Sequence, residues 1–533
     1  MDRPILKNKI YLYLTEFFAG MSVMAVELGA SRLLAPYFSS SQIVWTIIIG
    51  TIMIAMALGN LYGGKKSDKD PNPDKLYARI IVAAIWIAAI PVVGKYIIVL
   101  ISGVLIVTIS NNLLIIAAFL ACMIIFVFPL FLLGTVTPSL VKFTVDSLED
   151  SGSIVGRLNA SNTIGSIIGT FVPTFISIPA VGTAITFLIF AAILIVLCII
   201  YFFSAGLNIK RNKKIPVAIA LFIVCAIFGH DASFAFWQDE LTYEGESVYN
   251  YLQVYEDDSK VVLSTNVLFG TQSVYVKEEG PTGLYYDSAM ASLYMAGVSQ
   301  KSNLDVLILG NGSGTFSTQS KRYFDNLNVT GVEIDEKISD LAGEYFELSE
   351  DDRIITYDGR AYLNADNNKY DVIMVDAYKD ITIPFQMSSQ EFFMLVRDHL
   401  KDDGVMVVNM NMTSNEEGNI SQYIEDTIAS VFENVYVSDV EGTTNTELFA
   451  STDNEILNTL NKSVTKETNK DLIEMMSKVM GNISYYNGGD YILTDDRAPV
   501  ELLGMRALDS IIKEELTYYK KVYKEEGIQG LLK

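Results

Sequence analysis

Long apolar segments dominate the first 231 residues and restrict the folds open to this part of the chain. A helix that crosses a bilayer needs about 20 consecutive, mainly apolar residues. The run at residues 96–109 is apolar but short, so seven spans are predicted, with eight as the alternative. We therefore expect residues 1–231 to form an all-α polytopic membrane domain in contact with lipid. The seven predicted spans are residues 10–34, 43–62, 76–93, 113–133, 155–178, 183–203 and 215–228.

Charge is distributed unevenly between this part and the rest of the chain. Residues 1–231 contain 16 Lys or Arg and 10 Asp or Glu, a net of +6. The following 302 residues contain 23 and 52, a net of −29. The C-terminal part is therefore expected to be a soluble, acidic domain. Such a charge disfavours a nucleic-acid partner and suits cationic ligands.

Three groups of basic residues bear on the orientation in the membrane, because cytoplasmic loops carry an excess of Lys and Arg. They lie at residues 3–9, 65–75 and 210–214. Seven spans keep all three groups inside and place the acidic domain outside. An eighth span would bring that domain inside but would export the third group. The side on which the soluble domain lies therefore stays open.

The predicted spans contain ionisable and small residues. Glu16, Glu27 and Arg32 lie in or at the end of the first span. Ionisable groups at membrane depth are costly and face the bundle interior, where they pair or mark a pathway. Both alternatives stay open here. Gly165 and Gly169 have the Gly-x-x-x-Gly spacing that permits two helices to pack closely.

Residues 304–410 show the pattern of alternating parallel strands and helices. Three apolar runs, in LDVLILG, NVTGVE and YDVIMVD, end in Gly310, Glu333 and Asp376. Amphipathic stretches separate these runs. In folds of this kind the ligand binds at the carboxyl ends of the strands. We therefore expect the functional site at these chain positions.

The remaining soluble segments have simpler patterns. Short alternating runs at residues 241–276 predict a small antiparallel β region. The last part of the chain is helical in pattern and charged. We therefore expect a β-rich part at residues 232–300, a Rossmann-like α/β core at 301–450 and a helical extension at 451–533.

A glycine-rich loop follows the first predicted strand of the core, with Gly310, Gly312 and Gly314. Glycine adopts positive φ and lets a ligand approach the backbone closely. A dinucleotide fingerprint would need glycine where Thr315 stands. The spacing is instead typical of class I S-adenosylmethionine-dependent folds. Glu333 can accept hydrogen bonds from both ribose hydroxyls, and Asp358 and Gly359 follow in matching places, so a nucleoside pocket is favoured over a purely structural turn.

Asp376 ends an apolar strand that should point into the same crevice. A carboxylate there can act as a general base or hold a cation. The alternative is an aspartate that caps a helix or stabilises a turn. Asp380 follows on the next loop, and a second acid would favour an amine ligand. The three cysteines lie in apolar stretches and the chain has two histidines, so we expect no metal site.

With these residues, the soluble domain resembles the spermidine synthase (polyamine aminopropyltransferase) family, in its bacterial membrane-fused form. The resemblance covers about residues 249–412, with LTDDRAPVE at residues 493–501. It implies a multi-pass enzyme of the bacterial cell membrane, and it admits a homodimer. The implied reaction transfers an aminopropyl group from decarboxylated S-adenosylmethionine to putrescine or a related amine, giving spermidine and methylthioadenosine.

Carried over position by position, the resemblance implies a role for each matched residue. Glu333 would bind the ribose, Asp358 and Gly359 the adenine, and Asp376 would deprotonate the attacking amine. Gln253 lies where the family has a glutamine that touches the thioadenosine. The other implied contacts are Gly310, Gly312 and Gly314 on the nucleoside side, and Tyr286, Asp287, Ser313 and Asp380 on the amine side.

This chain departs from the family pattern on the amine side. The family loop usually reads Gly-Gly-Gly-Asp-Gly and its Asp holds an amine, whereas Ser313 stands there in this chain. Tyr286 replaces the histidine of a Tyr-His-Glu motif, and the Asp-x-x-Asp spacing is one residue longer between Asp376 and Asp380. Ordinary S-adenosylmethionine therefore stays open as the donor, and the amine acceptor is undetermined. The alternative functions are an S-adenosylmethionine-dependent methyltransferase and a non-catalytic polyamine transporter or sensor.

Overall fold

The computed structural model divides the chain into two compact units. One comprises Met1–Asp239 and Glu244–Tyr251, and the other Glu240–Tyr243 and Leu252–Lys533. Asp380 and most of the third basic group (Lys210, Arg211 and Lys213) lie outside the described residues. The domain boundaries expected at residues 231, 300 and 450 stay predictions. The structure describes residues 4–38, 41–108, 113–144, 151–204, 214–230, 233–234, 236, 241–265, 271–377, 383–411 and 417–507.

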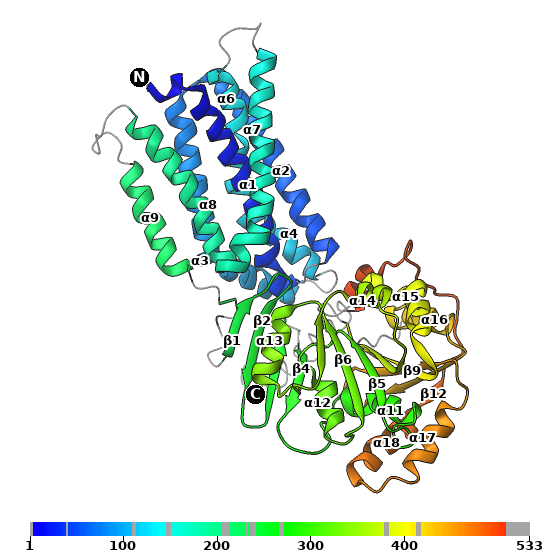
Figure 1. Ribbon diagram of the computed structural model, residues 1–533. Helices are drawn as coiled ribbons and strands as arrows, with labels where there is room; N and C mark the ends of the chain where they lie inside the picture. The colour runs from blue at the N-terminus through cyan, green and yellow to red at the C-terminus, as the bar shows by residue number, and fades with distance from the viewer. Residues whose placement is uncertain are drawn as a thin grey trace. The chain divides into compact units, whose positions relative to one another are not determined.

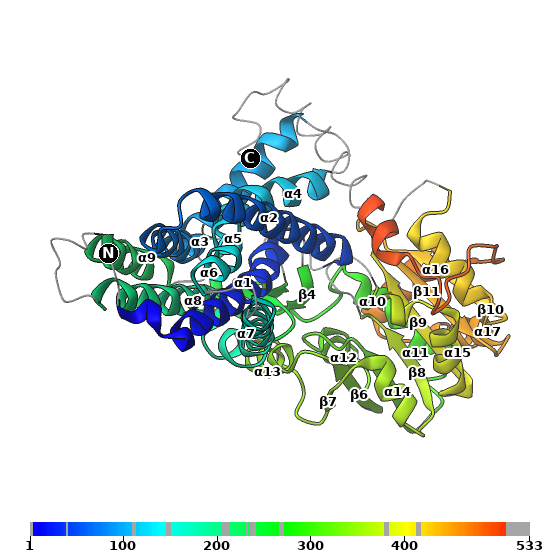
Figure 2. The same cartoon turned by 90° about the horizontal axis from the view of Figure 1, so that it is seen from above.

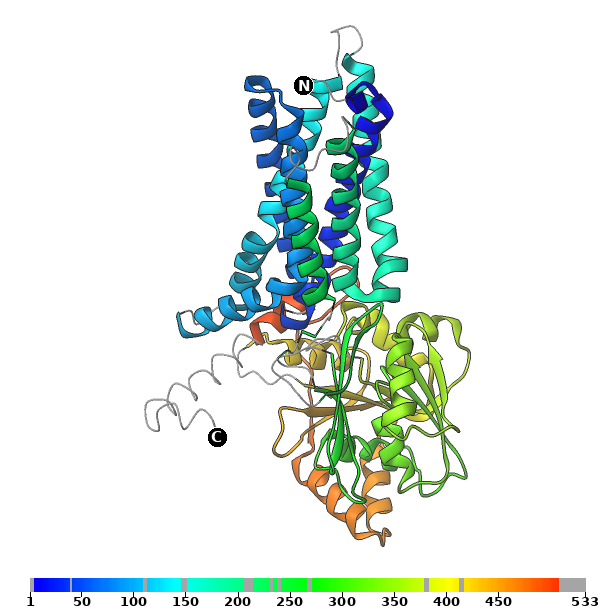
Figure 3. The same cartoon turned by 90° about the vertical axis from the view of Figure 1, so that its left-hand side faces the viewer.

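The first unit is built mainly from apolar helices, which Figures 1 and 3 show running alongside one another. A π-helical turn at Pro173–Ser177 joins the seventh helix to the eighth. The helices are α1 (Lys9–Phe38), α2 (Gln42–Lys69), α3 (Pro73–Thr108), α4 (Leu113–Ile125), α5 (Val127–Gly134), α6 (Val136–Thr144), α7 (Ser151–Val172), α8 (Ile178–Phe203) and α9 (Lys214–Gly229).

Within the described part of the chain, five helical stretches are long and apolar enough to cross a membrane. Two shorter apolar helices, α4 and α9, accompany them. This composition is compatible with insertion into a membrane, and the helical character predicted for this part of the chain is confirmed. The five stretches are Lys9–Phe38, Gln42–Lys69, Pro73–Leu105, Val127–Thr144 and Ser151–Phe203.

Two helix boundaries differ from the predicted ones. Residues 96–108 continue α3 without a break, so this run is not a separate helix. The span predicted at residues 113–133 is divided near Phe126 into α4 and α5. Pro129 gives a physical reason, since proline has no N–H to donate to the carbonyl four residues earlier. Gly182 marks the break inside α8, with a positive φ of 78°.

Helices α1 and α7 pack closely against each other (Figures 1 and 2). A Cβ added at Gly165 would lie 2.0 Å from the carbonyl oxygen of Phe17, and one at Gly169 would lie 2.1 Å from that of Met21. The close packing predicted from the glycine spacing is therefore confirmed. The buried Glu16 accepts hydrogen bonds from Thr137 Oγ1 at 2.5 Å and from an amide of α7, so it is paired within the bundle.

The second unit contains one large sheet and most of a smaller one. The smaller has the order β1-β2-β3-β4, and its β2–β3 and β3–β4 pairs are antiparallel, as predicted for this region. Its strands are β1 (Leu241–Glu246), β2 (Tyr251–Glu256), β3 (Lys260–Ser264) and β4 (Thr271–Val276).

The larger sheet has the strand order β12-β10-β11-β9-β8-β5-β6-β7. The five strands from β7 to β9 in this order are parallel, and β11 runs antiparallel to β9. The predicted Rossmann-like fold is confirmed. The strands are β5 (Leu304–Leu309), β6 (Leu327–Glu333), β7 (Arg353–Thr356), β8 (Tyr370–Val375), β9 (Leu400–Met410), β10 (Asn434–Asp439), β11 (Thr446–Ser451) and β12 (Ser484–Tyr485).

Helices cover both faces of the large sheet, and the apolar residues of its strands alternate between the two faces. One face is covered by α14 (Gly359–Ala365), α15 (Gln390–Asp398) and α16 (Ile420–Ala429). The other is covered by α10 (Tyr285–Ala289), α11 (Ala291–Met295), α12 (Thr315–Lys321), α17 (Ile456–Val464) and α18 (Lys470–Asn482). Helix α13 (Glu336–Tyr345) packs against the smaller sheet.

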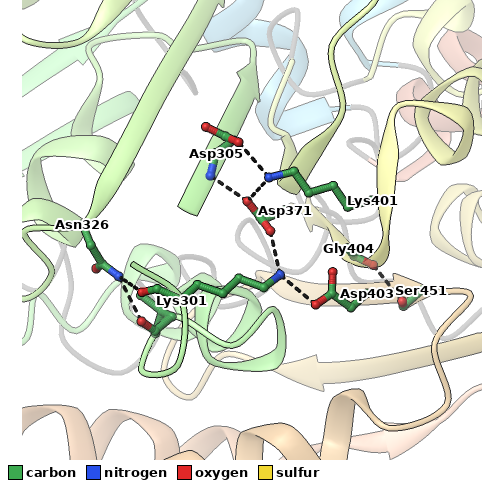
Figure 4. Close-up of polar contacts among 9 residues, drawn as sticks. Lys301, Asp305, Asn326, Asp371, Lys401, Asp403, Gly404 and Ser451 are labelled. Carbon is green, nitrogen blue, oxygen red and sulfur yellow. Dashed lines mark hydrogen bonds and ion pairs between the residues drawn. The ribbon is translucent and has the colours of Figure 1, made fainter. Parts of the chain in front are cut away.

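An ion-pair network joins β5, β8 and β9 near their amino ends (Figure 4). Its centre is the buried Asp371, which accepts hydrogen bonds from Lys301 Nζ at 2.6 Å and from Lys401 Nζ at 2.7 Å. Lys401 also pairs with Asp305 at 2.7 Å, and Lys301 pairs with Asp403 at 2.8 Å. These contacts fix the strands at the end opposite to the one where a ligand is expected.

Candidate active site

The carboxyl ends of β5 and β8 lie side by side at the point where the strand order reverses. From β5 the chain continues to β6 and β7 on one side of this point, whereas β8 and β9 lie on the other side. In open α/β sheets a crevice forms at this place and holds the ligand. Leu309 is level with Val375, and the N–H of Asp376 donates to the carbonyl of Leu309 at 2.9 Å. Gly310 and Asp376 therefore begin their loops next to each other.

The three loop glycines all have positive φ, 85° at Gly310, 52° at Gly312 and 75° at Gly314. Side chains at these positions would be strained. At Gly310 space is limiting as well, because a Cβ would lie 2.5 Å from the Cα of Ala377. The sequence thus permits the loop after β5 and the loop after β8 to meet backbone to backbone.

Glu333 ends β6 beneath the glycine loop. Its Oε2 accepts from the N–H of Gly312 at 2.9 Å, and its Oε1 accepts from the N–H of Asp335 at 3.0 Å. Burial raises the pKa of Glu333 above its ordinary value, although these backbone hydrogen bonds oppose the rise. Each carboxylate oxygen has a second lone pair, so the side chain can still accept hydrogen bonds from a ligand.

A pocket opens between this loop, β4 and α10. Asn311 is buried in its wall, and neither polar atom of its side chain has a hydrogen-bond partner among the described residues. A ligand with a donor and an acceptor could supply both partners. The pocket is lined by Gln272, Ser273, Tyr285, Tyr286, Ile308, Gly310, Asn311, Gly312, Thr315, Phe316 and Asp376.

Asp376 is the acid of this pocket. Its Oδ2 accepts a hydrogen bond from the Tyr285 hydroxyl, and its Oδ1 accepts from Asn409 Nδ2 at 3.0 Å. Burial raises the pKa of Asp376 to about 7, even though both hydrogen bonds lower it. A carboxyl group with such a pKa can take up and release a proton near neutral pH. It is oriented by two side chains and is suited to act as a base.

Comparison with known proteins identifies the family of the chain. A Spermine/spermidine synthase domain matches residues 285–445. A probable polyamine aminopropyl transferase of Bifidobacterium longum is 48% identical over 352 residues, which cover 63% of this chain and 77% of the relative. This chain belongs to the polyamine aminopropyltransferase family. It is an aminopropyltransferase.

Two further matches are more distant. The polyamine aminopropyltransferase of Vibrio vulnificus is 25% identical over 205 residues, covering 37% of this chain and 68% of that protein. A probable spermidine synthase of Corynebacterium glutamicum, whose structure is known, is 19% identical, covers 47% of this chain and 98% of its own, and has a TM-score of 0.36. The family assignment rests on the sequence matches.

Among the residues expected on the amine side of this aminopropyltransferase, Tyr286 lines the pocket. Its hydroxyl accepts from the N–H of Val274 at 3.3 Å. Asp287 instead holds the preceding loop, accepting from the N–H of Gly283 at 2.7 Å. The hydroxyl of Ser313 is fully buried and shares a 2.9 Å hydrogen bond with that of Thr315.

Other expected nucleoside contacts lie apart from the pocket lining. Asp358 caps α14, accepting from the N–H of Ala361 at 2.8 Å, and Gly359 begins that helix. Gln253 is buried in β2, opposite Ser264 of β3. Their roles in binding the thioadenosine stay predictions.

Several residues that line the pocket or contact Asp376 were not predicted. Tyr285 directly precedes Tyr286, but its contact with Asp376 joins residues 91 positions apart. Asn409 lies near the end of an apolar strand, at the same place in the pattern as Asp376, and this signal could have identified it. Gln272 and Ser273 carry no signal in the sequence, because the smaller sheet has to fold before β4 reaches the glycine loop.

Proposed function

We propose that Asp376 is the general base for aminopropyl transfer from decarboxylated S-adenosylmethionine to putrescine or a related amine. The observation that supports this most strongly is the place of Asp376, next to Gly310 and held by Tyr285 and Asn409. The glycine loop and Glu333 would hold the thioadenosine, with Gln253, Asp358 and Gly359 as further proposed contacts. Tyr286, Asp287 and Ser313 would shape the amine side, together with Asp380.

The chemistry requires a base because an ammonium ion has no lone pair with which to attack. Free amines of this kind have a pKa near that of lysine, about 10, so the acceptor arrives protonated. Asp376 takes one proton from the nitrogen. The nitrogen then bonds to the aminopropyl carbon while the bond between that carbon and sulfur breaks, and its electron pair stays on the sulfur of methylthioadenosine. Holding the two reactants in line would supply much of the acceleration.

The charge of the site favours the decarboxylated donor. Ordinary S-adenosylmethionine carries one more carboxylate than the decarboxylated form. Asp376 and Glu333 already place two acids around the pocket, and like charges in a buried site repel each other. A donor without the carboxylate avoids this cost.

Replacing Asp376 tests the proposal. Asp376→Asn keeps the size of the side chain and can accept from Tyr285, but it cannot take a proton. We expect kcat to fall by about 10²- to 10⁴-fold, with methylthioadenosine binding largely unchanged. Asp402→Asn, at an exposed acid of β9, is the matched control and should keep full activity.

The products distinguish the alternatives. The protein is incubated with either donor and putrescine. Release of methylthioadenosine supports aminopropyl transfer, whereas release of S-adenosylhomocysteine would indicate a methyltransferase. Unchanged turnover in Asp376→Asn would exclude Asp376 as the base.

We also propose that the helical unit anchors this enzyme in the cell membrane. The helices of this unit expose large apolar side chains that water would solvate poorly, such as Leu58 and Leu61 of α2, Phe171 of α7 and Phe228 of α9. Contiguous apolar surfaces of this kind suit lipid. Protease accessibility in intact cells determines on which side the second unit lies.

A further inference from the structure

Glu447 of β11 is a buried acid that the proposed reaction does not use. Its side chain is fully enclosed, at 0% exposure. Neither carboxylate oxygen has a hydrogen-bond partner among the described residues. A buried polar group without a partner costs free energy, and a charged group without a partner costs more. The described part of the chain therefore gives Glu447 no compensating hydrogen bond.

Three polar side chains stand in a row across the carboxyl edge of the sheet. Val375 is level with Val408, so Asp376 lies beside Asn409, and Asn409 is paired directly with Glu447. In each of the three strands, the residue two positions away belongs to the same buried core cluster, which includes Met374, Val407 and Phe449. Side chains two residues apart point to the same face, so Asp376, Asn409 and Glu447 share a face.

This row contains two acids and no cation. Asn409 donates to Asp376 at 3.0 Å and accepts from Asn445 Nδ2 at 2.8 Å. Burial and then the charge of Asp376 raise the pKa of Glu447 well above its ordinary value. A ligand that brings a positive charge would offset the free-energy cost of burying a charged Glu447. It would also reduce the repulsion between Glu447 and Asp376.

The strand order indicates which substrate would bring that charge. The glycine loop and Glu333 follow β5 and β6, on one side of Asp376, whereas Glu447 lies on β11, on the other side. A donor held by the glycine loop leaves the side of β9 and β11 to the acceptor. Neighbouring strands lie about 4.8 Å apart, so β8 and β11 are separated by roughly 10 Å. Two side chains that reach inward from these strands can bracket a short diamine.

We propose that Glu447 binds the second, non-reacting ammonium of a diamine acceptor and so selects diamines over monoamines. This proposal rests on the proposed function, in which the first nitrogen of the acceptor meets Asp376. Helix α10 carries Tyr285 and packs over β9 and β11, so the ammonium enters beneath this helix. Glu447 would then be a specificity-determining residue, distinct from the base.

A comparison of two acceptors tests the proposal. Binding of 1,4-diaminobutane and of 1-aminobutane to the methylthioadenosine-saturated full chain is measured by calorimetry, for wild type, Glu447→Gln and Glu433→Gln. Glu433 is an exposed acid just before β10 and serves as the control. In Glu447→Gln we expect the diamine to bind about 10- to 100-fold more weakly, since hydrogen bonds to charged groups contribute that much. Binding of the monoamine should not change.

An unchanged preference for the diamine in Glu447→Gln would overturn the proposal, and so would an equal loss for both amines. A second measurement compares the affinity of the same variants for the donor. If Glu447→Gln weakens binding of decarboxylated S-adenosylmethionine but not of methylthioadenosine, Glu447 serves the donor ammonium and the proposal is wrong. A different result would contradict the proposed function, namely an absence of aminopropyl transfer by the wild type. The binding comparison can be made without turnover, so the two failures are distinguishable.

Discussion

At the scale of single residues, the site depends on how Asp376 is surrounded. Burial disfavours the charged form of this carboxyl group, whereas hydrogen bonds from Tyr285 and Asn409 favour it. The balance leaves its pKa at about 7. An exposed aspartate would titrate near 4 and would be a weaker base.

The pH dependence of turnover follows from this balance. Below pH 7 Asp376 becomes protonated and cannot accept the proton of the amine, so kcat/KM, which reports the pKa of the free enzyme, should fall about tenfold per pH unit on the acid side. The hydrogen bond from Tyr285 stabilises the charged form. Tyr285→Phe should therefore raise the pKa of Asp376 and move the acid limb of the profile to higher pH. Tyr485→Phe, at an exposed tyrosine of β12, should leave the profile in place, and an unmoved limb in Tyr285→Phe would contradict the assignment.

At the scale of elements, the strand pattern of the second unit was readable from the sequence because the parallel strands are buried. Their apolar runs are nearly continuous, and the change to Gly310, Glu333 and Asp376 marks the edge where ligands bind. The helices of the first unit were harder to delimit. Pro129 divides one predicted span, and residues 96–108 extend α3 with no local signal that separates a long helix from two short ones.

The contact of α1 with α7 gives a prediction about stability. Gly165→Ala puts a methyl group against the backbone of Phe17, which cannot rotate away. Overpacking of this kind costs about 1–3 kcal/mol, so the thermal midpoint in detergent should fall. Gly156→Ala is the control on the same helix, because a Cβ there meets no atom within 4 Å. It should be neutral or slightly stabilising, and equal midpoints for the two variants would show that the helices do not touch at Gly165.

At the scale of the whole molecule, the network around Asp371 links strands that are far apart in the sequence. Burial alone would raise the pKa of Asp371, but hydrogen bonds from Lys301 and Lys401 hold it below its ordinary value. A lowered pKa adds stability above about pH 4, the value of an unfolded aspartate, and the stability is lost as the pH falls further.

Asp371→Asn should therefore destabilise the second unit by about 1–3 kcal/mol at neutral pH, since two lysines lose a partner. The difference from wild type should shrink below about pH 4. Urea denaturation of the full chain in detergent, followed at several pH values, measures both effects. Asp398→Asn, at an exposed acid of α15, should behave as wild type. A difference that persists at low pH would exclude the ion pairs as its source.

The residues proposed for the nucleoside side of the pocket follow from the sequence pattern more directly than those proposed for the amine side. The glycine loop and Glu333 belong to one continuous βαβ stretch, whose local pattern fixes their relation. Glu447 comes into line with Asn409 and Asp376 only after β11 pairs antiparallel with β9, which no local pattern reveals. Tyr285 belongs to α10, outside the sheet, and its contact with Asp376 likewise forms only in the folded domain.

The ion-pair network and the proposed active site occupy opposite ends of the same strands. Asp371 and Asp376 are five residues apart along one strand direction, about 16 Å, which is farther than directly coupled substitutions usually act. If the carboxyl edge binds the amine as proposed, substitutions at that edge should change the acceptor preference without weakening the scaffold. A change of acceptor would then need no compensating substitutions at the ion-pair network.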